Sequence, residues 1–268
     1  NLLRFSQLPL IENHVIYTIN KEEQPFFKIP ILEGAASQHI FYYSPKWNFY
    51  YTCKQLAKLL PGDKALVVAH DWLELGMMSN LGLQNPVIQF VHGNYDYYYD
   101  LSARHQNVVD KFICVSPVIQ KKLITVLSPE KARAVNYYRF PVPAVEASAR
   151  QNKYLKIVYA SGNLVDDNKQ FSLLPAISAL LQKAEIAVDW IIVGKGSSRD
   201  EVRDVMNANK ELVYFDELEN EDLIKLLSGA DIFLLPSLKE GFPVAVVEAM
   251  KAGLVPLVTN WEQATAAL

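Results

Sequence analysis

The chain has 268 residues, half of them apolar, with a formal net charge of −3 and a pI near 6.0. This length allows one large domain or two ordinary ones with well-buried cores, and the acidic balance excludes a general nucleic-acid binder, whose surface would be strongly basic. Cys53 and Cys114 form no CxxC pair and have no His at ligand spacing, so neither a disulfide framework nor a zinc site is predicted, and a reducing, cytoplasmic location is expected.

Strands and helices alternate along the first half of the chain, which predicts a parallel sheet with helices on both faces. The rhythm stops in the proline-containing stretch 137–153, so an interdomain linker is predicted there and the domains are expected at residues 1–146 and 147–268. The strands are expected at 14–19, 40–43, 65–69, 87–91, 111–115 and 133–136, and the helices between them include 49–60 and 117–127.

The same alternation resumes in the second half, so the predicted fold class is α/β with two doubly wound, Rossmann-like parallel-sheet domains facing across a cleft. The expected strands are 154–160, 188–193, 211–215, 231–235 and 255–258, with helices beginning at Lys169, Arg199, Asn220 and Pro243.

One stretch, SLKEGFPVAVVEAMKAGLVPLVT at 237–259, carries two glutamates, Glu240 and Glu248, with seven residues between them. It is typical of a strand, a loop, a helix and a second strand. Pro243 is expected in the first turn of the helix, where a missing N–H is tolerated, and Gly253 is expected to end that helix. Glu240 is therefore predicted just outside the helix N-terminus and Glu248 inside the helix, both facing a crevice at the carboxyl end of a parallel strand.

The loop between the two glutamates has the chemistry of an anion site. The N–H groups of Gly241 and Phe242 can donate, and the helix N-terminus that follows at Pro243 favours an anion. Carboxylates suit the hydroxyls of a sugar. Each glutamate alone is also explained as a solvated carboxylate near a helix dipole.

The segment EGFPVAVVEAMKAGLVPLV resembles the donor-binding motif of retaining GT-B glycosyltransferases, specifically glycosyltransferase family 4. The resemblance implies a GT-B fold and a nucleotide diphosphate sugar as donor, a UDP-, GDP- or ADP-sugar. It also implies that Glu240 holds sugar hydroxyls, that Glu248 holds the ribose, and that a hexose passes with retention to a glycan or lipid-linked acceptor, as in polysaccharide biosynthesis. No Asp-x-Asp is present, so metal independence and no cofactor are expected.

The second domain opens with a second set of candidate donor-binding residues. Gly162 and Asn163 follow the first strand, and Lys169 is expected at the head of a helix, where a cation and N–H donors suit a diphosphate. A solvated lysine is the alternative. The resemblance implies that Lys169 grips the phosphates, although Asn163 stands where arginine is usual and Gln170 where glycine is usual. Asparagine brings no charge.

Two further positions are predicted to border the nucleotide. Gly194 and Gly196 follow a strand, but Arg199 occupies the third glycine position of the dinucleotide fingerprint, which argues against a dehydrogenase. The resemblance implies that Gly194 skirts the nucleotide and that the base lies near Leu218; a plain strand-to-helix turn is the alternative.

In the first domain, His70 and His92 end neighbouring predicted strands. His92, followed by Gly93, resembles the family histidine near the reacting carbon and is preferred over His70; a structural hydrogen-bonding role is the alternative. The tyrosine-rich stretch 95–99 suits stacking on sugar rings or the packed start of a helix.

The leading interpretation is a nucleotide-sugar-dependent hexosyltransferase. The alternatives are a GT-B synthase or phosphorylase that uses a sugar phosphate acceptor, and a non-catalytic GT-B-like accessory subunit, which Asn163 permits. A location at the inner membrane face with peripheral membrane contact fits the resemblance, although no basic amphipathic helix stands out. Because the chain begins with Asn1 and the resemblance implies further family elements before and after it, we expect sequence to be missing at both ends.

Overall fold

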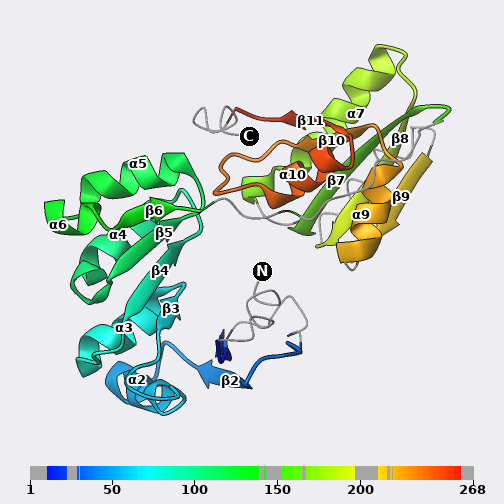
Figure 1. The fold of residues 1–268 in the computed structure, drawn as a ribbon. Coiled ribbons are helices and arrows are strands. Elements are labelled where there is room, and N and C mark those ends of the chain that lie inside the picture. The colour runs from blue at the N-terminus through cyan, green and yellow to red at the C-terminus, as the bar shows by residue number, and fades with distance from the viewer. Residues whose placement is uncertain are drawn as a thin grey trace. The chain divides into compact units, whose positions relative to one another are not determined.

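The computed structural model describes residues 11–22, 29, 31–138, 142, 152–164, 167–196, 211–215, 218 and 220–260. The chain divides into two compact units, drawn in Figure 1. Unit 1 contains Asn1–Cys114 and Gln120–Tyr137, and unit 2 contains Val115–Ile119 and Tyr138–Leu268. The predicted boundary between residues 146 and 147 falls outside the described residues.

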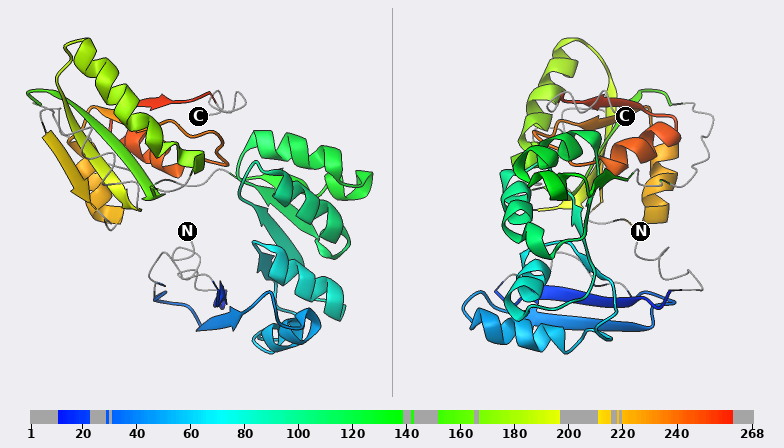
Figure 2. Two further views of the ribbon diagram at one scale, coloured as in Figure 1. Left: turned by 180° about the vertical axis from the view of Figure 1, so that it is seen from behind. Right: turned by 60° about the vertical axis from the view of Figure 1, so that its left-hand side comes forward.

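Unit 1 contains two parallel sheets, where the alternation of strands and helices predicted one. β1 (His14–Asn20) and β2 (Ser37–Tyr43) pair with each other through all seven residues, and Figure 2 shows them side by side. Within the described residues β3 is an edge strand of the second sheet, so the first two strands do not extend it. The second sheet has the order β3 (Val67–Ala69), β4 (Val87–Val91), β5 (Lys111–Cys114) and β6 (Val135–Tyr137).

Some helices of unit 1 begin at a short polar side chain that caps them. Asp71 precedes α3 (Trp72–Leu81) and forms a capping box with Glu74, and Gly82 ends the helix at φ 59°, the left-handed conformation that glycine adopts without cost. The other helical elements are α2 (Phe49–Ala57), α4 (Asp96–His105), η1 (Gln106–Val108), α5 (Pro117–Val126), whose first three residues belong to unit 2, and α6 (Pro129–Ala132).

Unit 2 contains one parallel sheet of five strands. Counted from the β9 edge, the strands follow one another in the chain order 3-2-1-4-5. The order therefore reverses between β7 and β10, and sheets of this kind bind ligands outside the carboxyl ends of the strands at this switch point. The strands are β11 (Val255–Val258), β10 (Ile232–Leu235), β7 (Leu155–Asn163), β8 (Val188–Lys195) and β9 (Glu211–Phe215), in spatial order.

Both faces of this sheet are buried, because neighbouring residues on each strand point into different cores. Val158 and Phe233 belong to one cluster, while Ile157 and Leu234 belong to the other. Figure 1 shows the first face covered by α9 (Asn220–Ser228) and α10 (Val244–Lys251), and the second by α7 (Leu174–Lys183). The prediction of a doubly wound α/β unit is confirmed.

Two predicted boundaries in unit 2 are wrong. β7 continues to Asn163 through a register shift after Ala160, so Gly162 and Asn163 lie on the strand end and not in a loop. The helix expected from Lys169 begins at Leu174, after the 3-10 turns η2 (Asp167–Lys169) and η3 (Phe171–Leu173). The helix expected from Arg199 lies outside the described residues.

Candidate functional site

At the switch point, Asn168 connects the segments that follow β7 and β10. Its amide Nδ2 donates to the carbonyl of Lys239 at 2.9 Å, and its Oδ1 accepts from the Lys239 N–H at 3.0 Å. The N–H of Leu238 donates to the Asn168 carbonyl at 2.8 Å. Three hydrogen bonds thus fix the loop before α10 against the turn after β7. An asparagine in a polar turn carries no sequence signal for such a contact.

Lys169 and Glu240, both predicted site residues, meet directly at this junction. Lys169 Nζ lies 2.6 Å from Glu240 Oε1, and the two side chains are 26% and 10% exposed. The pair is partly withdrawn from water, where a charge-assisted hydrogen bond is stronger than at an open surface. Lys169 lies at the end of a 3-10 turn, so it does not combine its charge with an α-helix N-terminus as predicted.

Gln170, directly after Lys169, adopts φ 49° and ψ 43°. This left-handed conformation is the one that glycine adopts at little cost and other residues adopt with strain. A glutamine therefore occupies a backbone conformation that suits glycine. That conformation also ends the turn and delays the start of α7 to Leu174.

Glu248 lies within α10, as predicted, and is 7% exposed. Burial raises the pKa of its carboxyl above the ordinary value, because removing water disfavours the charged form. Pro243 is the residue before the first helical residue and not part of the first turn, and Gly253 follows the helix at φ 84°. Gly241 and Phe242 lie in the loop that leads to this helix.

Gly194 lies near the end of β8, where a side chain would have no room. Its φ is 151°, and a Cβ there would overlap the carbonyl oxygen of Ser161 and lie 2.8 Å from Leu164 Cδ2. Asn163 aligns with Lys195 across the two strands. Gly194 therefore permits the close approach of the β7 and β8 ends beside the switch point.

Two other residues complete the description of unit 2. Leu218 packs, partly buried, against the core cluster on the α9 and α10 face, so the structure gives its side chain a packing role. Ser237, two residues after β10, is fully buried, and within the described part of the chain its hydroxyl has no hydrogen-bond partner. No sequence pattern signalled Ser237.

In unit 1, His70 and His92, the two alternatives for the histidine near the reacting carbon, form a pair. His70 Nδ1 lies 2.7 Å from His92 Nε2, and the rings stack with centroids 5.0 Å apart. Burial lowers the pKa of His70 to about 4, with a smaller effect from His92, and burial also lowers the pKa of His92. Both rings are therefore neutral near pH 7, and one ring N–H donates to the other ring nitrogen.

Asp71 and Tyr97 adjoin the histidine pair. The Tyr97 hydroxyl donates to Asp71 Oδ1, and burial together with the Asp71 carboxylate raises the pKa of Tyr97. The tyrosine-rich stretch 95–99 leads into α4, and Tyr99 is buried with its hydroxyl 2.7 Å from Asn94 Oδ1. The stretch is therefore the start of a helix, but only part of it is packed, because Tyr95 and Tyr97 are 38% and 48% exposed. Stacking of these exposed rings on a sugar stays a prediction.

Acid should destabilise the protein through His70. Its folded-state pKa of about 4 lies below the ordinary 6.5, so the unfolded chain takes up the proton first as the pH falls. The stabilisation is complete above pH 6.5 and is lost down to pH 4, by up to about 3 kcal/mol. Urea unfolding of a His70→Asn variant should show a flatter pH dependence than the parent. His39→Asn, at an exposed position of β2, is the control; equal pH slopes for the parent and His70→Asn would contradict the assignment.

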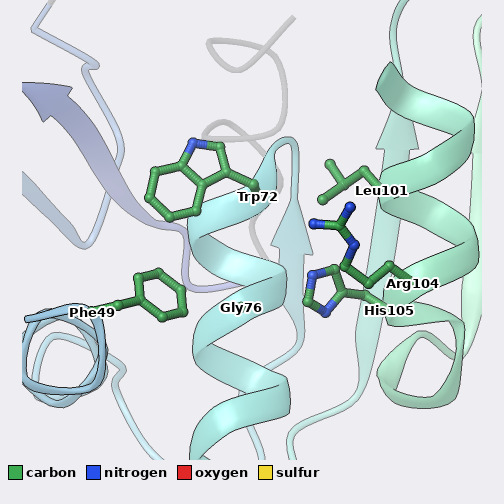
Figure 3. A pocket seen from close by; sticks show the side chains of 6 residues that line it. All are labelled: Phe49, Trp72, Gly76, Leu101, Arg104 and His105. Carbon is green, nitrogen blue, oxygen red and sulfur yellow. The ribbon is translucent and has the colours of Figure 1, made fainter. Parts of the chain in front are cut away.

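A separate hollow of about 250 Å³ lies over α3 and contains none of the predicted site residues. Figure 3 shows Phe49 reaching it from α2 and Arg104 from α4. Phe49 stacks on Trp72 at 5.4 Å between centroids, and a Cβ on Gly76 would lie 2.5 Å from Phe49 Cζ. The glycine thus allows the ring to lie against α3.

Within the described residues, no helix is long and apolar enough to cross a membrane. The same residues contain no group of three or more His, Cys, Asp or Glu side chains placed to hold a metal ion.

Residues 142–266 match the family of glycosyl transferases group 1. A Campylobacter jejuni N,N'-diacetylbacillosaminyl-diphospho-undecaprenol alpha-1,3-N-acetylgalactosaminyltransferase is 27% identical over 128 residues, which are 48% of this chain and 29% of that protein. An Escherichia coli UDP-Gal:alpha-D-GlcNAc-diphosphoundecaprenol alpha-1,3-galactosyltransferase is 35% identical over 75 residues, 26% of this chain and 19% of that protein. Each match thus spans less than a third of the curated relative.

Solved structures share the fold at low sequence identity. TarM superposes with a TM-score of 0.64 at 16% identity, covering 77% of this chain and 43% of TarM. An Escherichia coli trehalose-6-phosphate structure bound with UDP-2-fluoro glucose gives a TM-score of 0.66 at 14% identity, covering 97% of this chain and 81% of that one. The chain therefore matches the glycosyl transferases group 1 over residues 142–266, and its α/β architecture is the GT-B fold.

Proposed function

We propose that the protein transfers a hexose from a nucleotide diphosphate sugar to a lipid-linked or glycan acceptor, with retention of configuration. The observation that carries the proposal is the Lys169–Glu240 pair at the switch point of a group 1 glycosyl transferase domain. The names of both curated relatives describe glycosyl transfer and a diphospho-undecaprenol compound, which supports a lipid-linked acceptor.

In this proposal Lys169 and Glu240 separate when the donor binds. The Lys169 ammonium would then neutralise the diphosphate, and Glu240 would accept hydrogen bonds from sugar hydroxyls. The bond from the sugar's anomeric carbon to the phosphate oxygen breaks, a bond to the acceptor oxygen forms, and the acceptor proton passes to the leaving phosphate. Lys169 stabilises the charge that develops on that phosphate, as preorganised cations do in many enzymes.

The remaining predicted residues would complete the donor site. Glu248 would bind the ribose and His92 would lie near the reacting carbon, held in one tautomer by His70. We propose that the reaction needs no metal ion, because the chain has no Asp-x-Asp and Lys169 supplies a cation. We also propose that it takes place at the inner face of a membrane, where a lipid-linked acceptor would be presented.

Donor binding to a Glu248→Gln variant tests the proposal. Isothermal titration with UDP-, GDP- and ADP-sugars should reveal one donor that binds the parent, and the variant should bind it about 10-fold more weakly, because a hydrogen bond to a charged group is lost. Glu221→Gln makes the same charge change at an exposed position of α9 and should bind like the parent. The proposal fails if none of these sugars binds, or if Glu248→Gln binds as tightly as Glu221→Gln.

A further inference from the structure

Helix α2 carries two different faces. Thr52, Cys53 and Leu56 point into the core of unit 1. On the outward side Tyr50 is 50% and Tyr51 is 61% exposed. Residues three or four positions apart share one face of a helix. The exposed positions four and eight residues after Tyr50 therefore lie on the same outward face.

Lysines also lie beside these rings and beside Trp47, which precedes the helix and is 45% exposed. Lys21 Nζ lies 4.8 Å from the Trp47 ring centroid, and Lys54 Nζ lies 4.6 Å from that of Tyr50. Lys46 Nζ lies 3.0 Å from the Glu22 carboxylate.

Lys58 adds a further exposed cation at the C-terminal end of the helix. Together these side chains form a surface that is aromatic and positively charged. We call this the α2 surface: Lys21, Lys46, Trp47, Tyr50, Tyr51, Lys54 and Lys58.

We propose that the α2 surface docks the protein onto an anionic lipid membrane. Trp and Tyr rings, apolar with one polar edge, favour the headgroup level of a bilayer. Lysine side chains can lay their stems along apolar material and leave the ammonium among lipid phosphates, and each lysine near an anionic membrane strengthens binding.

The charge of the surface distinguishes a membrane from a protein partner. Lysine is depleted from the cores of protein–protein interfaces, where aromatic residues are enriched. Here the rings of Trp47 and Tyr50 each have a lysine ammonium over one face. Positive charges beside exposed aromatic rings are suited to binding anionic lipid headgroups. The lysines come from the end of β1, the approach to α2 and the helix itself, which is why no basic amphipathic helix was apparent in the sequence.

Sedimentation with lipid vesicles tests this inference separately from sugar transfer. The full chain should bind phosphatidylcholine vesicles containing about 30 mol% phosphatidylglycerol, bind pure phosphatidylcholine far less, and dissociate as salt rises. Lys54→Gln should weaken binding about fivefold and Lys54→Gln with Lys58→Gln about 25-fold, at about fivefold for each lysine. Lys121→Gln, an exposed lysine of α5 in unit 1, is the matched control and should have no effect.

Tryptophan fluorescence gives a second measurement. Vesicles with phosphatidylglycerol should shift the emission of the parent to shorter wavelength, because Trp47 enters a less polar medium, and Trp47→Phe should abolish the shift while it retains binding. Equal binding to both vesicle types, or an equal loss with Lys121→Gln, would overturn the inference. So would concentration-dependent self-association in the ultracentrifuge without vesicle binding, which would assign the surface to a second copy of the chain. None of these readouts depends on a sugar donor.

Discussion

A Lys169→Ala variant should fold but transfer sugar at least about 100-fold more slowly than the parent, the scale expected when one preorganised group that stabilises transition-state charge is removed. Lys169 Nζ contacts Glu240 Oε1 at 2.6 Å, and the Glu240 side chain is only 10% exposed. Alanine would leave that carboxylate without its cation. The free energy of unfolding should therefore also fall, by about 1–3 kcal/mol, less than for a fully buried pair because Lys169 is partly exposed.

The variant Lys239→Ala is the matched control for this prediction. Lys239 is close to Glu240 in the chain, and its contacts with Asn168 use only its backbone N–H and carbonyl, so its side chain can be removed without breaking them. Transfer rates and urea midpoints of Lys169→Ala, Glu240→Gln and the double variant complete a cycle that isolates the interaction of the pair. If Lys239→Ala slows transfer as much as Lys169→Ala, general surface charge and not the pair is responsible.

The sequence pattern predicted most strands because their apolar runs are bounded by strong turn signals. β4 (Val87–Val91), β9 (Glu211–Phe215) and β11 (Val255–Val258) have the predicted bounds. The helix start predicted at Lys169 is wrong for a local reason. Gln170 adopts a left-handed φ of 49°, a conformation that a glutamine in the sequence does not predict. A boundary set by backbone strain is therefore one kind that periodicity cannot predict.

The contacts within the candidate site depend on register, which the sequence pattern does not fix. In unit 1, Ala69 pairs with Gln89, so His70 follows opposite Phe90, two positions before His92. The pattern identified both His70 and His92 as strand-end residues, but their ring contact at 2.7 Å requires the observed pairing. Asn168 shows the same limit, since its partners Leu238 and Lys239 are about seventy positions away.

Substitution by alanine should change the free energy of unfolding very differently at two glycines of unit 2. Gly194 has φ 151°, and an added Cβ would overlap the Ser161 carbonyl oxygen, a backbone atom that moves only with β7. A Cβ on Gly162, 32 positions earlier and at the exposed end of β7, would meet nothing within 4 Å. The backbone strain alone costs about 1–3 kcal/mol, and the overlap adds to it.

Gly194→Ala should therefore lower the free energy of unfolding by about 3 kcal/mol or more, whereas Gly162→Ala should change it by less than about 1 kcal/mol, with a gain possible from the stiffer unfolded chain. Urea unfolding followed by tryptophan fluorescence, to which Trp190, fully buried in the same unit, contributes, measures both variants. Similar midpoints for the two would mean that the ends of β7 and β8 can separate at little cost. A lower midpoint for Gly194→Ala alone would show that the close approach of the β7 and β8 ends is a fixed part of the fold, because only at Gly194 would the added Cβ meet the β7 backbone.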